Sequence, residues 1–249
     1  MLAMAGIRVE VGQPGQARTL LQKAMTMQSR LRGEVAHPLM AYMLTLEASL
    51  DRDAGRFEMA QIAIGKAASI AARLKGSELE KAAAAIDGAA GQLALTQGKP
   101  VDAIAPLERQ LAYLRSFYQD VPHPNLARGL ARLAIALARS GRSDEATKLT
   151  TESRAVLVKV FPDGEHSSYA GLLLADASVL QARNQHADAV KLLLQALAIR
   201  EKRIGKEPSP EKQQLLRFLA DSASKAGLPS ATAYQNQANA MQAAWLSRQ

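Results

Sequence analysis

The feature that most constrains the fold of this 249-residue chain is a short frame of residues that returns at a constant interval of 43. The frame reads GRFEMA at 55–60, GKPVDA at 98–103 and GRSDEA at 141–146, and NQHADA at 184–189 has Asn in place of its first Gly. The first residues of the frame, which serve as markers, are Gly12, Gly55, Gly98, Gly141, Asn184 and Gly227. Six copies in register without an insertion indicate a repeat array, in which each repeat packs on its neighbours.

Two further positions of the repeat hold small residues, one five residues after the marker and one seven residues before it. They are Ala17, Ala60, Ala103, Ala146, Ala189 and Thr232 after the marker, and Ala5, Ala48, Gly91, Ala134, Ala177 and Ala220 before it. Gly and Asn tolerate the left-handed backbone that ends a helix, and the Pro and acidic residues that follow suit the first turn of the next helix. The frame therefore predicts the turn of a helix hairpin whose helices approach closely through small side chains.

Each repeat is thus expected to contain two helices. The first helices are predicted at 38–54, 81–97, 124–140, 167–183 and 210–226, and the second helices at 57–75, 100–117, 143–160, 186–203 and 229–247. Ala and Leu are abundant and aromatic residues make up only 4% of the chain, a composition that favours an all-α class. We expect one array over 1–249, with repeats at 1–36, 37–79, 80–122, 123–165, 166–208 and 209–249.

The segment HPNLARGLARLAIALARSGRSDEATKLTTESRAVLVKVFPDGEH at 123–166 resembles the long type of tetratricopeptide repeat found in kinesin light chains and in many bacterial regulatory proteins. It has His-Pro before the first helix, a small residue within that helix, a Gly-containing turn, and an early Ala in the second helix. The resemblance covers essentially the whole chain and implies a right-handed superhelical solenoid of about six antiparallel helix pairs.

One feature of that family is missing from this sequence. Kinesin-light-chain repeats often carry paired Asn residues, three and two positions before the small residue, that help to bind peptide backbones. The corresponding pairs here are Thr45–Leu46, Gly88–Ala89, Ala131–Arg132, Leu174–Ala175 and Arg217–Phe218. That mode of peptide binding is therefore not carried over.

The two ends of the array lead to different expectations. Extending the period backwards places the start of the first helix before residue 1, so we expect the first repeat to be truncated at its N-terminus, as in a fragment of a longer protein. The last segment, TAYQNQANAMQAAWLSRQ at 232–249, has Gln and Asn at second-helix positions that are apolar elsewhere, which is typical of a polar capping helix. Trp245 is expected to pack within this cap rather than to form a binding platform.

The residue types needed for catalysis or metal binding are sparse. The chain has no Cys, no Gly-rich phosphate loop, no zinc-ligand spacing and no nucleophile elbow. His37, His123 and His166 share one position of the repeat and are expected to act at helix entries, whereas His186 is expected in a solvated turn. The carboxylate pairs Asp51/Asp53 and Glu78/Glu80 are expected to be surface charges. We therefore expect no enzyme activity, no cofactor and no bound metal.

A stack of helix hairpins offers a concave groove lined by its first helices. The predicted lining residues are Tyr42, Ser49, Gln92, Arg128, Arg139, Ser178, Gln181, Gln214, Arg217 and Lys225. Arg128, Arg139, Arg217 and Lys225 would make the later half of the groove basic. Because Arg captures carboxylates in a bidentate manner, the expected ligand is an acidic peptide or partner domain.

Three functional hypotheses follow from these observations. The first is a protein–protein interaction scaffold, and the alternative is the C-terminal regulatory or sensor region of a larger bacterial signalling protein, such as a serine/threonine kinase or a transcription regulator. The net charge of +8 suggests nucleic-acid binding as a third class, but the basic residues lack interleaved aromatics and any recognised motif. No signal peptide and no run of 18 apolar residues is present, so we expect a cytoplasmic protein without a membrane segment.

Overall fold

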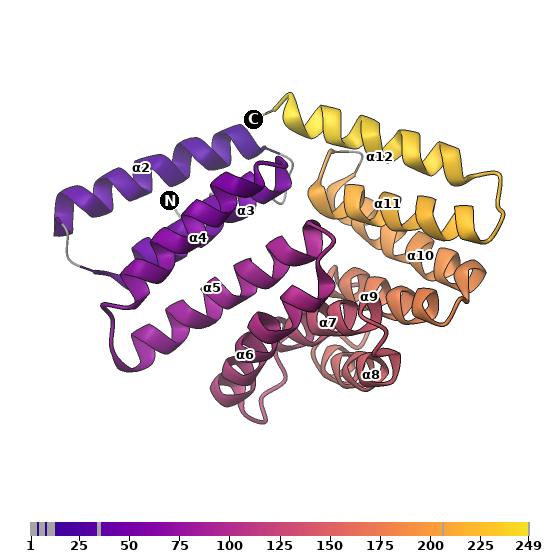
Figure 1. Cartoon of the computed structure of the whole chain (residues 1–249), viewed down its shortest axis with the longest axis horizontal. Coiled ribbons are helices and arrows are strands. Elements are labelled where there is room, and N and C mark those ends of the chain that lie inside the picture. Colours follow the sequence, from indigo (N-terminus) through magenta and orange to yellow (C-terminus); the bar gives the residue numbers. More distant parts are fainter. Residues whose placement is uncertain (1–3, 5–7, 9–12, 34–35, 206, 249) are drawn as a thin grey trace. The chain divides into compact units, whose positions relative to one another are not determined.

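The computed structural model describes residues 4, 8, 13–33, 36–205 and 207–248. Within these described residues the chain forms eleven α-helices and no strand, which confirms the predicted all-α repeat fold (Figure 1). The helices are α2 (Pro14–Arg32), α3 (Pro38–Asp53), α4 (Phe57–Ala71), α5 (Gly76–Thr96), α6 (Pro100–Tyr118), α7 (Pro124–Arg139), α8 (Ser143–Val160), α9 (Ser168–Ala182), α10 (His186–Ile204), α11 (Pro210–Lys225) and α12 (Ala231–Leu246). None of these helices is long and apolar enough to cross a membrane.

The start of α5 differs from the prediction, because the helix begins at Gly76 rather than at residue 81. In the other repeats the first helix is capped by a His or Ser that is followed by Pro or Ser. In the repeat that contains α5, the corresponding position is Glu80, which lies inside the helix. Glu, Lys and Ala are good helix formers and contain no signal to stop a helix, so α5 extends towards its N-terminus. Gly76, the first residue of α5, has a φ of +56°, a left-handed value that Gly adopts readily.

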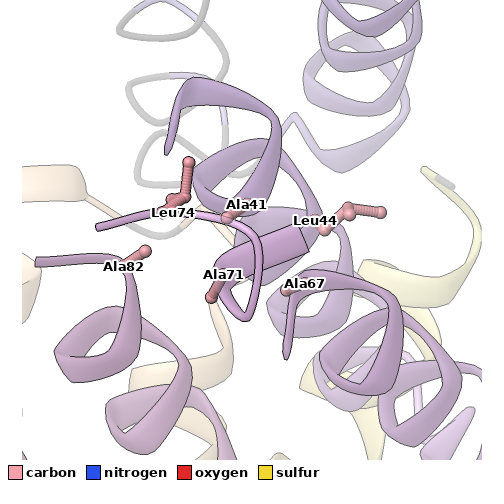
Figure 2. Packing of buried hydrophobic residues seen from close by; sticks show 6 residues of the cluster. All are labelled: Ala41, Leu44, Ala67, Ala71, Leu74 and Ala82. Carbon is pink, nitrogen blue, oxygen red and sulfur yellow. The ribbon is translucent and has the colours of Figure 1, made fainter. Parts of the chain in front are cut away.

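The chain divides into two compact units, Met1–Tyr113 with Trp245–Gln249, and Leu114–Ala244. In the first unit, small and branched apolar side chains from α3, α4, α5 and the turn after α4 form one cluster, whose six buried members are shown in Figure 2. They are Ala41, Leu44, Ala67, Ala71, Leu74 and Ala82. A cluster in the second unit joins Ala127 of α7, Leu157 of α8, and Tyr169 and Leu172 of α9. Each unit thus has its own apolar core, built where a hairpin meets the next first helix.

The repeated frame forms the predicted turn at every marker that the structure describes. Gly55, Gly98, Gly141 and Gly227 have φ values of 76°, 73°, 81° and 69°, and Asn184 has a φ of 60°. These values are left-handed, the conformation that only Gly and Asn adopt readily at a helix C-terminus. The markers therefore end the first helices as expected, whereas Gly12 and Ala5 lie outside the described residues.

The small residues on both sides of the turn are buried. Among the alanines that follow the marker, Ala17, Ala60, Ala103, Ala146 and Ala189 are all 0% exposed. Ala134 and Ala177, which precede their markers, are also 0% exposed. A Cβ added at Gly91 would lie only 2.5 Å from the Cγ atom of Leu107 in α6. Small side chains are therefore what allows the two helices of a hairpin to approach.

The three histidines at one position of the repeat act at helix entries, as predicted. The Nδ1 atoms of His37 and His123 each accept a hydrogen bond of 3.1 Å, from the backbone N–H groups of Leu39 and Asn125. His166 Nδ1 accepts from the N–H of Ser168 at 3.2 Å. Each imidazole thus caps one of the otherwise unpaired N–H groups of a helix start.

Two of these histidines also stack on an aromatic ring from the end of the preceding helix. Tyr118 lies 4.1 Å from His123 and Phe161 lies 3.6 Å from His166, measured between ring centroids, with interplanar angles of 10° and 7°. The stacks join the end of one repeat to the start of the next.

Protonation of His166 is expected to destabilise the fold. Burial lowers the pKa of His166 from its ordinary value of 6.5, and the nearby charges of Arg203 and Arg128 lower it further, against a smaller opposing effect of Asp163. The folded state therefore favours neutral imidazole, so its contribution to stability is complete above pH 6.5 and is lost as the pH falls below that value. His166→Asn keeps a capping oxygen but does not titrate, so its urea midpoint should fall less between pH 7 and pH 5 than that of the wild type. Parallel pH profiles of the two proteins would contradict this expectation.

Candidate partner-binding surfaces

The described residues contain no group of three or more His, Cys, Asp or Glu side chains that could hold a metal ion. His186, expected to be solvated, instead begins α10 and has its Nδ1 atom buried without a hydrogen bond. Trp245 is 1% exposed, so it does not offer a binding platform.

The expectation of surface carboxylates is wrong for Asp51. Its side chain is buried, and its Oδ1 atom accepts from Arg18 Nη2 at 2.8 Å and from Arg56 Nε at 2.9 Å. Asp51 lies close to the hairpin turn at Gly55. The guanidinium groups of Arg18 in α2 and of Arg56, directly after Gly55, both reach its side chain. It therefore ties α2, α3 and the start of α4 together, while Glu78 and Glu80 are exposed as expected.

In the first unit, the predicted groove residues Tyr42 and Ser49 lie on α3 and Gln92 lies on α5. The ammonium of Lys81 in α5 lies 5.8 Å from the centroid of the Tyr42 ring, within the range of a cation–π contact. Gln92 Oε1 accepts from Arg52 Nη1 of α3 at 3.3 Å. Contacts between neighbouring first helices thus bring Tyr42 and Gln92 to one side of the α3–α5 pair.

In the second unit, Arg128 and Arg139 are exposed on α7, a helix whose other residues between 126 and 138 are nearly all buried. They are eleven positions apart, which places both side chains within about 20° on the same side of a helix and about 16 Å apart along its axis. The sequence prediction that these two arginines share a surface is consistent with this arrangement.

Arg139 is held in place by a residue that the sequence analysis did not select. Its Cζ atom lies 5.3 Å from the ring centroid of Phe218 in α11. Partial desolvation lowers the pKa of Arg139, which the carboxylate of Asp221 opposes, but a guanidinium remains charged at neutral pH. Phe218 occupies one of the two positions at which kinesin-light-chain repeats often carry Asn, and the sequence contains no signal for its contact with Arg139.

The predicted groove residues Gln181 and Gln214 lie on α9 and α11 of the second unit. Gln181 Nε2 of α9 donates to the buried Ser222 Oγ of α11 at 2.6 Å, and Gln214 is half-buried on α11. We refer to the residues Arg128, Arg139, Gln181, Gln214 and Phe218 as the α7–α11 surface.

Three of the predicted groove residues make contacts within the second unit. Ser178 is 1% exposed and donates to the carbonyl of Leu174 at 2.8 Å, so it cannot contact a ligand. Arg217 donates to Gln242 Oε1 of α12 at 2.8 Å, because its position on α11 faces the second helix of its own hairpin. Lys225 forms a 3.0 Å ion pair with Asp221, which offsets its charge. Arg217 and Lys225 thus have partners within the second unit, whereas Arg128 and Arg139 are exposed on α7.

The comparisons with known proteins agree with this architecture. A sequence model of the tetratricopeptide-repeat family matches residues 177–211, and no curated protein matches the chain. The crystal structure of the kinesin light chain nearly identical TPR-like repeats of Podosopora anserina is similar, with a TM-score of 0.51, 23% identity, and coverage of 83% of this chain and 97% of that one. BtubC (BKLC) from P. vanneervenii is also similar, with a TM-score of 0.57, 17% identity, and coverage of 93% of this chain and 90% of that one.

At these identities the solved structures show a shared fold. Repeats of this kind are typically non-catalytic scaffolds, and the fold is consistent with protein–protein interaction. The repeat match, the left-handed turns every 43 residues and the paired helices all indicate an array of helix hairpins. Residues 177–211 thus match a tetratricopeptide repeat, and the chain has the fold of kinesin-light-chain-like TPR repeats.

Proposed function

We propose that this chain is a non-catalytic scaffold, a single array of repeats that binds an acidic peptide or partner domain on its first helices, with the α7–α11 surface as the binding site. The observation that carries the proposal is the pair of exposed guanidinium groups, Arg128 and Arg139, on one side of an otherwise buried helix. A rigid, buried helix holds the two cations at a constant separation, which lowers the entropy lost when a ligand binds.

The chemistry of the two arginines indicates the kind of ligand. A guanidinium forms two parallel hydrogen bonds with one carboxylate, and the contact between Arg139 and Phe218 restricts the rotation of that side chain. A separation of about 16 Å along α7 corresponds to about five residues of an extended peptide. A ligand with two carboxylates at that spacing would engage both arginines.

Replacing both arginines by glutamine is expected to weaken partner binding at least about tenfold, because two charge-assisted contacts are lost. The free energy of unfolding should change little, since both side chains are exposed. The measurement is a pull-down from a lysate of the source organism, followed by titration of the recovered partner against wild type and Arg128→Gln/Arg139→Gln.

A matched control carries Lys148→Gln and Lys159→Gln, which remove the same charge from exposed positions of α8 in the same hairpin. Only the arginine variant should lose affinity. Equal losses in both variants would mean that net charge, and not the α7–α11 surface, determines binding.

A further inference from the structure

The first unit contains a hollow of about 750 Å³ that lies between α2 and α4 and is floored by α3. We call it the α2–α4 groove, and its lining residues are Met25, Thr26, Ser29, Arg30, Met40, Leu44, Lys66, Ser69 and Ile70. Successive residues of a helix are about 100° apart, so Met40 and Leu44 lie on the opposite side of α3 from Tyr42 and Ser49. The α2–α4 groove is therefore separate from the predicted groove on the side of α3 that carries Tyr42 and Ser49.

The floor and the rim of the α2–α4 groove differ in chemistry. Met25, Met40, Leu44 and Ile70 make the floor apolar, and they belong to or pack against the cluster of Figure 2. Methionine side chains are flexible and polarizable, so such a floor can adapt to different apolar groups. The rim is exposed and polar, with the hydroxyls of Thr26, Ser29 and Ser69 and the cations of Arg30 and Lys66.

The next repeat along the chain has an ion pair at two positions that correspond to lining residues of the α2–α4 groove. Positions 44 and 66 correspond, 43 residues later, to Asp87 and Arg109. Arg109 donates to Asp87 Oδ1 from Nη2 at 2.5 Å and from Nε at 3.1 Å. The third repeat (80–122) therefore pairs a cation with a carboxylate of its own. In the second repeat (37–79) the same two positions hold the cation Lys66 and the apolar Leu44.

Neither rim cation forms an ion pair with another residue in the described part of the chain. None of the ion pairs between described residues involves Lys66 or Arg30. Both side chains are exposed and border the same apolar floor. The complementary ligand thus combines an apolar side chain with a carboxylate.

We propose that the α2–α4 groove is a second docking site, which binds an acidic amphipathic segment of a partner protein. A large apolar side chain of the segment lies on Met40 and Leu44, and a neighbouring carboxylate pairs with Lys66 or Arg30. The hydroxyls of Thr26, Ser29 and Ser69 are positioned along the rim, where they can bond to polar groups of a peptide. This supply of hydrogen-bonding groups favours a peptide over a bare hydrocarbon chain.

The test uses a fluorescein-labelled amphipathic peptide of Leu and Glu, about 14 residues or four helical turns long. Binding is measured by fluorescence anisotropy with the full chain carrying Arg128→Gln and Arg139→Gln, so that the α7–α11 surface does not contribute. We expect saturable binding, and about tenfold weaker binding when Lys66→Glu is added, because a like charge then faces the peptide. A counterpart peptide with Gln in place of Glu should bind with similarly reduced affinity.

Two further variants make the result specific. Lys23→Glu makes the same charge change at an exposed position of α2 outside the groove and should leave affinity unchanged. Leu44→Asp places a carboxylate where the third repeat has Asp87 and should abolish peptide binding. Because Leu44 is also a buried core residue, the loss counts for this variant only when circular dichroism shows a folded chain, and Lys66→Glu otherwise decides the result. Absence of binding, or equal losses with Lys66→Glu and Lys23→Glu, would overturn the second site and leave the proposal for Arg128 and Arg139 untouched.

Discussion

Replacing Ala134 with phenylalanine is expected to lower the free energy of unfolding by about 1–3 kcal/mol. Ala134 lies in α7, seven residues before the turn at Gly141, and is 0% exposed. Ala146 of α8, on the other side of the turn, is also 0% exposed, so no space remains for a ring between the helices. The larger side chain must separate the hairpin or adopt a strained rotamer, and urea unfolding followed by circular dichroism would measure the loss.

A matched control for this substitution is Ala155→Phe, which adds the same ring at an exposed position of α8. It should change the urea midpoint much less than Ala134→Phe. Ala177, the equivalent buried residue of α9, should behave like Ala134. If Ala134→Phe were as stable as Ala155→Phe, the idea that small residues set the distance between paired helices would be wrong.

Replacing Gly91 with alanine is expected to destabilise the first unit, although alanine is normally the better helix former. The new Cβ would lie 2.5 Å from Cγ and 2.7 Å from Cδ2 of Leu107, a side chain that is 1% exposed and has no room to move. Overpacking costs about 1–3 kcal/mol. The gain in helix propensity is about 1 kcal/mol, so the net loss should be up to about 2 kcal/mol.

Gly88→Ala provides the control within the same helix. Its Cβ would meet only the end of the Gln110 side chain, which can rotate away. The propensity gain should then prevail, making Gly88→Ala neutral or stabilising by up to about 1 kcal/mol. Thermal melts of the two variants should therefore shift in opposite directions, and a shared direction would contradict the close approach of α5 and α6 at Gly91.

Much of the fold could be predicted from the sequence because its signals act locally. A residue with left-handed φ is needed at each turn whatever surrounds it, so Gly55 and Asn184 could be identified without a structure. The same is true of His37 and His123, which cap N–H groups only two residues away. The start of α5 was predicted wrongly because the prediction relied on a local capping signal, and Glu80 at the capping position does not provide one.

Contacts between side chains of different helices could not be predicted, because they depend on neighbours that are distant in the sequence. The sequence predicts both Arg217 and Arg139 as basic groove residues and does not distinguish them. In the structure Arg217 contacts Gln242 of α12, whereas Arg139 lies over the ring of Phe218 of α11. Asp51 carries the same charge as Glu78, but it is buried because Arg18, which is 33 residues away, reaches it. A repeat period does not contain this information.

The sequence by itself determined the class, the turns and the small contact residues of each hairpin, because backbone conformation and side-chain size are properties of single residues. Only the tertiary structure decided which charges remain available to a partner. Arg109 is neutralised by Asp87, while Lys66, at the same position of the preceding repeat, lines the α2–α4 groove together with Leu44. The difference arises because an ion pair needs two residues from separate helices to meet, and packing determines whether they do.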